Sequence, residues 1–242
     1  MRYQFVDCRY EVGKPWRGRE LFLAGHIPGA SFLDVDTDLA DLSVPDAGRH
    51  PLPSAEAFAV AAGRAGIGAG VFVVAYDQGM TGGAARLWWL LRHFGHDDVA
   101  VLNGGISVWL GPLRPGEEQV APAEFDPRPR TGDTIEADEL NARLDDPRLA
   151  LVDARAPERY RGEVEPIDPV AGRIPGAVNV PFTSAELPRE VLEAEEIAVY
   201  CGSGVTACVD LLALARAGRD DARLYPGSWS EWSGRGLPAE RN

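Results

Sequence analysis

Short apolar runs alternate with helical patterns along most of this chain. Residues 71–75 (VFVVA) form one such run, and a helical pattern over 84–94 follows it and ends at Gly95. A second run, 197–200 (IAVY), precedes an amphipathic pattern that extends to Gly218. This alternation is typical of βα units on a parallel sheet, in which ligands bind at the carboxyl ends of the strands. The pattern therefore predicts an α/β fold.

Four segments of the first half recur in the second half in the same order. The matches are 5–9 (FVDCR) with 151–155 (LVDAR), 24–30 (AGHIPGA) with 171–177 (AGRIPGA), 73–77 (VVAYD) with 197–201 (IAVYC), and 102–109 (LNGGISVW) with 225–232 (YPGSWSEW). Ordered matches of this kind indicate a tandem duplication. Arg9 and Arg155, which follow the first matched strand of each copy, are expected to pair with internal carboxylates.

A proline-rich stretch separates the two copies. Residues 111–134 contain five prolines, several charges and no sustained periodicity, which is typical of a linker on the surface. We therefore expect a first domain at 1–112, a linker at 113–134 and a second domain at 135–242. The first copy also carries a long inserted loop, 33–53, which is rich in aspartate and holds Arg49 and His50.

Cys201 is the residue that most directly indicates a chemical function. It ends an apolar run and opens the loop CGSGVT, residues 201–206, so a strand would deliver one thiol to a helix N-terminus. Backbone N–H groups and the helix dipole stabilise a thiolate there. A free cysteine is also often a small buried apolar residue, and the loop alone leaves both alternatives open. The aligned residue of the first copy is Asp77, so only the second copy presents a thiol at this point.

The remaining cysteines give a weaker signal. Cys208 lies within the predicted helix among valine and leucine residues, where core packing is favoured, and Cys8 follows another predicted strand. No cysteines have the Cys-x-x-Cys spacing, and three cysteines with four histidines do not make a metal-ligand cluster. We therefore expect no zinc or iron–sulfur site, and no cofactor.

Composition and charge restrict the partners and the cellular setting. The chain has 242 residues, of which 45% are hydrophobic, and a formal net charge of −13. That charge disfavours nucleic acid and acidic membrane surfaces as partners. The N-terminus has no apolar stretch long enough for a signal peptide, and the odd number of cysteines suits a reducing compartment. We expect a cytoplasmic protein that does not associate with membranes.

Together these motifs resemble the two-domain sulfurtransferases of the rhodanese superfamily, over essentially the whole chain. The loop 201–206 is similar to that of 3-mercaptopyruvate sulfurtransferases, whereas thiosulfate-specific rhodaneses carry Arg and Lys there. The Gly-His-Ile-Pro-Gly-Ala segment, the Trp88-Trp89 pair and the segment 225–232 are also similar. The resemblance implies two rhodanese-like domains, each a small parallel sheet flanked by helices, and a first domain that is catalytically inactive because Asp77 replaces the cysteine.

The resemblance also implies a reaction and a catalytic set. The Cys201 thiolate would take a sulfur atom from 3-mercaptopyruvate, a small anionic donor, release pyruvate and hold the sulfur as a persulfide. A thiol such as thioredoxin or a small thiol, or cyanide, would then accept it. Ser203, His50 and Asp36 would complete the catalytic set, with Asp34 as the alternative to Asp36.

Substrate binding is assigned in the same way. Arg159 matches the family's substrate-binding arginine, and a guanidinium can grip a carboxylate through two parallel N–H bonds. The loop residues expected to surround the sulfur are Gly202, Gly204, Val205 and Thr206. Thr206 is also expected to cap the helix that follows.

One position departs from the family pattern. Mammalian mercaptopyruvate enzymes carry a second arginine nine residues after the one that matches Arg159, and this chain has Asp168 there. The second cation would then be Arg161, Arg173 or Arg49. Arg173 itself stands where the motif usually has a histidine.

Other functions fit the pattern less well. A phosphatase of the same fold has a loop one residue longer that ends in a phosphate-binding arginine, which 201–206 lacks. Thiosulfate:cyanide transfer as the main activity needs positive charge near the outer sulfonate, and the neutral Gly202 and Ser203 disfavour it. A non-enzymatic persulfide carrier or regulatory module often lacks the thiol or stands alone, whereas this chain keeps Cys201 and a second domain.

Overall fold

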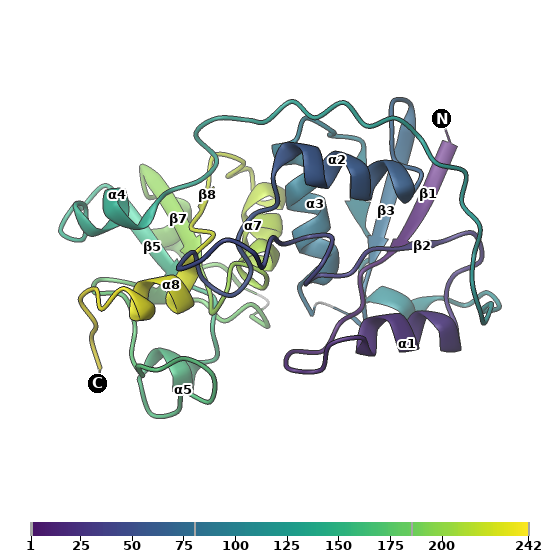
Figure 1. Cartoon of the computed structure of the whole chain (residues 1–242). Helices are drawn as coiled ribbons and strands as arrows, with labels where there is room; N and C mark the ends of the chain where they lie inside the picture. Colours follow the sequence, from purple (N-terminus) through teal and green to yellow (C-terminus); the bar gives the residue numbers. More distant parts are fainter. Residues whose placement is uncertain (1, 80, 185, 242) are drawn as a thin grey trace. The chain divides into compact units, whose positions relative to one another are not determined.

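The computed structural model describes residues 2–79, 81–184 and 186–241, and the chain divides into two compact units (Figure 1). Unit 1 comprises residues 1–41 and 52–130, and unit 2 comprises residues 42–51 and 131–242. The segment 42–51 thus comes from the first copy of the repeat but belongs to unit 2. The proline-rich stretch 113–130 belongs to unit 1.

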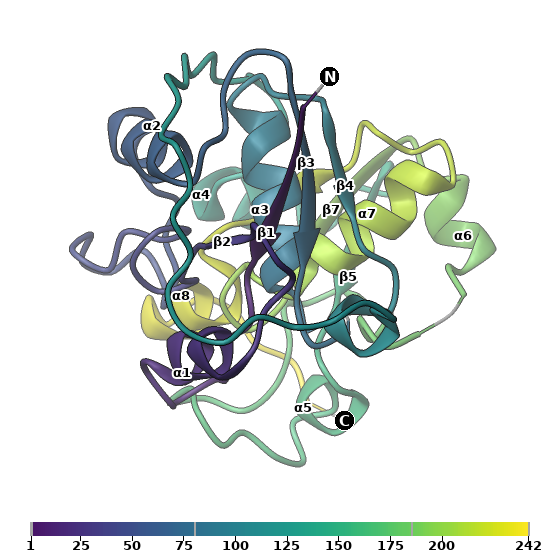
Figure 2. The same cartoon turned by 90° about the vertical axis from the view of Figure 1, so that its right-hand side faces the viewer.

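Unit 1 is a four-stranded parallel sheet with helices. Its strands follow the order β2-β1-β3-β4, and every neighbouring pair is parallel. The elements are β1 (Arg2–Asp7), α1 (Arg17–Ala24), β2 (Ser31–Phe32), α2 (Ala55–Arg64), β3 (Val71–Tyr76), α3 (Gly83–His93), β4 (Val99–Val101) and the 3₁₀ helix η1 (Gly105–Val108). Figure 2 shows α3 running along the sheet, where it packs on β3 and β4.

Backbone hydrogen bonds attach the proline-rich stretch to unit 1. Arg114 and His26 form an antiparallel bridge, and the Ala123 N–H donates to the Gly63 carbonyl at 2.9 Å. Gly63 suits this contact, because a methyl group there would lie 2.6 Å from the Ala123 oxygen. The stretch is therefore held to the surface of unit 1 by specific contacts, although it contains no regular helix or strand.

Unit 2 repeats the architecture of unit 1. Its sheet has the order β6-β5-β7-β8, again with parallel neighbours. The elements are α4 (Ala137–Asn141), β5 (Leu149–Asp153), α5 (Pro157–Tyr160), β6 (Val178–Asn179), α6 (Arg189–Leu192), β7 (Glu196–Tyr200), α7 (Ala207–Arg216), β8 (Arg223–Leu224) and α8 (Ser228–Gly234). The α/β class predicted from the sequence is confirmed in both units.

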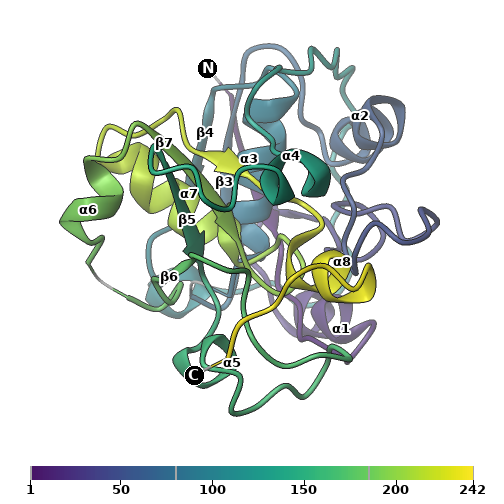
Figure 3. The same ribbon diagram turned by 90° about the vertical axis from the view of Figure 1, so that its left-hand side faces the viewer.

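The central strand β7 is apolar because both of its faces are covered. Four of its five residues, 197–200, are buried, as is typical of a strand in the middle of a parallel sheet. Helix α7 packs on it with its own buried face (Figure 3). The buried tryptophans Trp229 and Trp232 of α8 share a core cluster with Tyr200 of β7. This packing fixes the end of β7, and with it the position of Cys201.

A buried ion pair lies at the carboxyl end of β1 in unit 1 and of β5 in unit 2. In unit 2, Arg155 donates to Asp153 at 2.6 Å and to the Gly172 carbonyl at 2.7 Å, and its guanidinium lies 4.7 Å from the Trp229 ring centre. The Tyr200 hydroxyl donates to the same aspartate at 2.7 Å. In unit 1, Arg9 and Asp7 form the matching pair, and Arg9 reaches the Gly25 carbonyl at 2.8 Å. The predicted pairing of both arginines with internal carboxylates is thus confirmed.

Among the described residues, no helix combines the length and the apolar character that crossing a membrane requires.

The buried pair of unit 2 leads to a prediction about stability. Arg155→Met keeps an apolar stem beside Trp229 but leaves the Asp153 carboxylate buried without its cation. We expect the free energy of unfolding of this unit to fall by about 3–5 kcal/mol. Arg161→Met is the control, because Arg161 pairs with Glu163 at the surface, where the two side chains are 39% and 55% exposed. Denaturant titrations in which both variants lose equal stability would contradict the prediction.

Candidate active site

Cys201 lies directly after β7, and the loop 201–206 leads from it into α7. The Gly204 N–H donates to the Cys201 sulfur at 3.1 Å, and the Cys201 N–H donates to the Ser228 hydroxyl at 3.1 Å. The thiol is 1% exposed. Although a structural cysteine is often this buried, Cys201 has a polar neighbour aimed at its sulfur. An N–H group and a helix N-terminus at this atom stabilise negative charge on sulfur.

Two glycines allow the loop to close around the sulfur. Gly204 has a φ of +76°, which disfavours other residues, and a methyl group there would lie 2.5 Å from the Pro226 carbonyl oxygen. At Gly202, an added methyl group would lie 2.7 Å from Nη2 of Arg49 and 3.3 Å from Nη1 of Arg159. The residue after the cysteine is therefore in close contact with two guanidinium groups.

One expectation for the loop is wrong. Thr206 occupies the N-cap position of α7, but its side chain makes no capping hydrogen bond. The reason is its backbone, which already has helical angles of −71° and −20°, whereas a capping side chain needs an extended residue. The Ser228 hydroxyl, which the sequence did not single out, instead bonds the loop: it accepts from Cys201 and donates to the Tyr225 carbonyl at 3.0 Å.

The other two cysteines, Cys8 and Cys208, are buried in surroundings that differ from those of Cys201. Burial, together with the nearby charges of Asp7 and Asp77, raises the pKa of the Cys8 thiol well above its usual value, so Cys8 stays protonated at neutral pH. Cys208 is fully buried in α7 and donates to the Gly204 carbonyl at 3.4 Å. Both surroundings suit packing rather than nucleophilic attack.

In unit 1 the loop that follows β3 corresponds to the cysteine loop, and its N–H groups donate to the side chain of Asp77. Its carboxylate accepts the N–H groups of Gly79 at 2.8 Å, Gly82 at 3.1 Å and Ala84 at 3.3 Å. The strand-to-helix loop of unit 1 thus also directs N–H groups at an anion, but a permanent side-chain carboxylate satisfies them. The thiol of unit 2 occupies the equivalent place in the chain.

The segment 42–51 brings His50 to the cysteine loop within unit 2. Nδ1 of His50 lies 2.8 Å from the Ser203 hydroxyl. The Arg49 N–H donates to the Ser230 hydroxyl at 3.0 Å, which anchors the segment on α8. A histidine bonded to a hydroxyl of the cysteine loop can move a proton to or from a reacting group. Two of the predicted catalytic residues are thus adjacent, although 153 positions separate them in the sequence.

Asp36 and Asp34 lie in unit 1. One oxygen of the Asp34 carboxylate accepts the N–H groups of Asp36 at 2.8 Å and Thr37 at 3.2 Å, so it stabilises its own turn. Burial raises the pKa of Asp34. The pairing of Asp36 with His50 stays a prediction.

The two arginines close to Gly202 are both paired with carboxylates. Arg159, on α5, donates to Glu165 at 2.7 Å and to Asp168 at 3.1 Å. Arg49 forms an ion pair with the other oxygen of Asp168. Of the three residues considered as a second cation, Arg49 is therefore the one beside the loop. Arg161 pairs with Glu163 on the surface, and the Arg173 guanidinium lies 3.3 Å from Glu240 and 4.6 Å from the Tyr160 ring centre.

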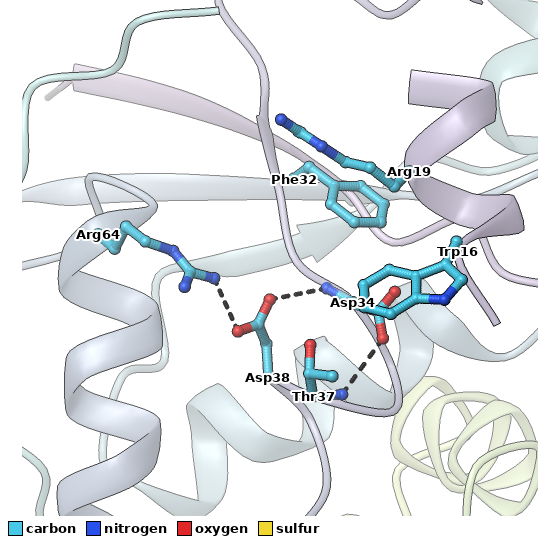
Figure 4. A pocket seen from close by; sticks show the side chains of 7 residues that line it. All are labelled: Trp16, Arg19, Phe32, Asp34, Thr37, Asp38 and Arg64. Carbon is cyan, nitrogen blue, oxygen red and sulfur yellow. Dashed lines mark hydrogen bonds and ion pairs between the residues drawn. The ribbon is translucent and has the colours of Figure 1, made fainter. Parts of the chain in front are cut away.

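Unit 1 also contains a hollow of about 340 Å³ whose lining combines aromatic and charged side chains (Figure 4). The lining residues are Trp16, Arg19, Phe32, Asp34, Thr37, Asp38 and Arg64. Their arginines are already paired, Arg64 with Asp38 at 2.7 Å and Arg19 with Glu117. The hollow has no cysteine or histidine in its lining, and the chemistry described above has its groups in unit 2.

Comparison with known proteins places the chain in a family. A model of the rhodanese-like domain matches residues 1–111 and 136–235. A probable 3-mercaptopyruvate sulfurtransferase of Pseudomonas aeruginosa is 43% identical over 94% of this chain and 88% of its own length. The crystal structure of SseA from Escherichia coli, a 3-mercaptopyruvate sulfotransferase with the rhodanese fold, superposes with a TM-score of 0.81 at 34% identity, covering 94% of this chain and 93% of SseA. A probable thiosulfate sulfurtransferase superposes with a TM-score of 0.64 at 29% identity, over 98% and 96% of the two chains.

Two α/β units, each with a four-stranded parallel sheet, and the cysteine loop of the second define a tandem rhodanese-type protein. The chain belongs to the rhodanese-like family, as its motifs predicted.

Gly204→Ala is expected to weaken the hydrogen bond from the loop to the Cys201 sulfur, the contact that we call the thiol cradle. The substitution places a side chain at a positive φ and against the Pro226 oxygen, so the N–H group directed at the sulfur must shift. We expect alkylation of Cys201 by iodoacetamide to slow at least roughly tenfold, with a lower melting temperature. Gly234→Ala is the control, because an added methyl group there meets open space. Equal alkylation rates in the two variants would show that the cradle does not activate the thiol.

Proposed function

We propose that this protein transfers a sulfur atom from 3-mercaptopyruvate to a thiol or to cyanide through a persulfide on Cys201. The observation that carries the proposal is the Gly204 N–H directed at the Cys201 sulfur, beside the Ser203 and His50 pair. The protein is a sulfurtransferase, because proteins of that activity match it over nearly its whole length. Its donor is proposed from the relatives and from the chemistry of the loop.

The reaction takes place in two half-reactions. In the first, the Cys201 thiolate attacks the donor sulfur, the carbon–sulfur bond breaks, and its electron pair leaves with the enolate of pyruvate, which then takes up a proton. In the second, an acceptor thiolate or cyanide attacks the outer sulfur of the persulfide, and the electron pair of the sulfur–sulfur bond returns to Cys201. No net oxidation or reduction of the protein occurs.

The surrounding residues supply protons and anion binding in this proposal. Ser203 and His50 form a hydrogen-bonded pair that can deliver the proton to the leaving enolate. Asp36 is proposed to fix the tautomer of His50. Gly202, Gly204, Val205 and Thr206 form the loop around the persulfide, and Arg159 binds the donor carboxylate.

Thiosulfate is the alternative donor, because a structural neighbour is a probable thiosulfate sulfurtransferase. The loop 201–206 has no arginine or lysine of its own to bind a sulfonate. We therefore expect kcat/KM to favour 3-mercaptopyruvate when both donors are compared with the same acceptor. A ratio that strongly favours thiosulfate would reverse the choice of donor.

A thiol acceptor such as thioredoxin or a small thiol fits a reducing compartment. The three cysteines are all free thiols, and we propose a cytoplasmic location on that basis.

Cys201→Ser is expected to abolish sulfur transfer and leave the fold intact, because serine fits the loop but cannot carry the sulfane atom. Mass spectrometry after incubation with donor should show one added sulfur atom on Cys201 of the wild-type protein. Cys208→Ser is the control, since its hydroxyl can donate to the Gly204 carbonyl as the thiol does. Turnover in the Cys201 variant, or equal loss in the control, would refute the assignment of the nucleophile.

Arg159→Gln is expected to raise the KM for 3-mercaptopyruvate roughly tenfold or more, with little effect on the KM for cyanide. The reason is that the guanidinium would bind the carboxylate of the donor, which cyanide lacks. Arg161→Gln removes a neighbouring arginine that pairs at the surface, and it should leave both constants unchanged. Steady-state kinetics in which the Arg159 variant affects both substrates equally would contradict this role.

A further inference from the structure

The two arginines beside the cysteine loop hold a carboxylate of the chain itself. One oxygen of Asp168 pairs with Arg49, and the other accepts from Arg159 at 3.1 Å. The Asp168 side chain is 4% exposed. The same two guanidinium groups are the ones closest to Gly202, the residue after the nucleophile. A carboxylate is therefore already clamped between two cations next to Cys201.

The local charges at this point cancel. Arg49, Arg159 and Arg155 contribute three positive charges, and Asp168, Glu165 and Asp153, which pair with them, contribute three negative charges. An anionic donor that approaches the loop meets a neutral cluster on a chain with a net charge of −13. A guanidinium group becomes available to a donor only when one of these carboxylates is displaced from its arginine.

The two carboxylates that contact Arg159 are held differently. Glu165 accepts from Arg159 and from the backbone N–H groups of Asp168 and Ile167, at 3.1 and 3.2 Å. Burial favours its neutral form, but these donors hold the pKa of Glu165 below its usual value. The contacts described for the Asp168 carboxylate are with the two arginines alone, and burial raises its pKa despite them. Asp168 is therefore the carboxylate that is more easily displaced.

We propose that Asp168 occupies the place of the donor carboxylate, so that an incoming donor must displace it from Arg49 and Arg159. This inference rests on the function proposed above and names the residue that sets donor affinity. A planar carboxylate can replace the planar carboxylate of Asp168 with both guanidinium groups still paired. Asp168 is thus a residue that sets the affinity of the site for an anionic donor.

The arrangement also predicts how the affinity for pyruvate depends on pH. The charged groups that face Asp168 are Arg49 from the segment 42–51, Arg159 from α5, Arg155 after β5, and Glu165 from its own loop. When Asp168 is protonated, it no longer competes for the arginines, whereas pyruvate stays ionised. The affinity for pyruvate should therefore rise as the pH falls through the pKa of Asp168, and this rise should be absent when the residue cannot ionise.

Pyruvate binding measured by calorimetry on the full-length protein tests the inference without relying on turnover. We expect Asp168→Asn, which keeps the size and removes the charge, to bind pyruvate about tenfold more tightly than the wild type near neutral pH. Its KM for 3-mercaptopyruvate should fall by a similar factor, and its pyruvate affinity should lose the pH dependence. Glu163→Gln is the control, because it removes one negative charge from an exposed ion pair in the same segment.

Three outcomes decide the matter. Equal or weaker pyruvate binding by a folded Asp168→Asn protein, with sulfur transfer intact in the wild type, would overturn the inference and leave the proposed function standing. Tighter binding by the Glu163→Gln control as well would also overturn it, since net charge alone would then explain the effect. A wild-type protein that neither binds pyruvate nor forms a persulfide with 3-mercaptopyruvate would refute the proposed function itself. Should the asparagine variant not fold, Asp168→Ser and the pH dependence of the wild type provide the same test.

Discussion

The backbone N–H groups at the junction of a buried strand and a helix, which must find acceptors outside the helix, are the constraint on which this structure depends. Such groups need an acceptor, because a helix N-terminus leaves its first N–H groups without partners. In unit 1 the Asp77 carboxylate satisfies three of them permanently. In unit 2 the sulfur of Cys201 accepts from Gly204. The same backbone arrangement thus holds a carboxylate in one copy and, in the other, the thiol that we propose as the nucleophile.

The buried ion pairs give this junction a rigid support. Asp153 ends the strand β5, which lies beside β7, and Arg155 follows it; Tyr200 at the end of β7 donates to the Asp153 carboxylate. Each member is almost fully buried, so the loss of one partner would leave an uncompensated charge or donor in the core. Tyr200, the residue before Cys201, is therefore held by its hydrogen bond to Asp153. This contact limits the movement of the thiol relative to its N–H donor.

Charge near the loop is balanced rather than positive. Arginines contact the residue after the nucleophile, and aspartate and glutamate side chains from the segment after α5 neutralise them. This balance bears on the departure from the family pattern at Asp168. The position lacks a cation, yet Asp168 contacts two arginines, Arg49 and Arg159. In the exchange of carboxylates that we propose, affinity for the donor depends on displacing Asp168 and not on the count of positive charges.

The sequence by itself determined the α/β class, the duplication and the pairing of Arg155 with an internal carboxylate, and it singled out Cys201 as the candidate nucleophile, because strand and helix periodicity and matched motifs are local properties of the chain. The tertiary structure decided that Ser228 rather than Thr206 bonds the loop, since the backbone angles of Thr206 depend on packing. It also decided that segment 42–51 joins unit 2 and that Arg49 and Arg159 share Asp168. The contact between Arg49 and Asp168 joins residues 119 positions apart, and no periodicity of the sequence specifies which distant side chains meet once the chain is packed.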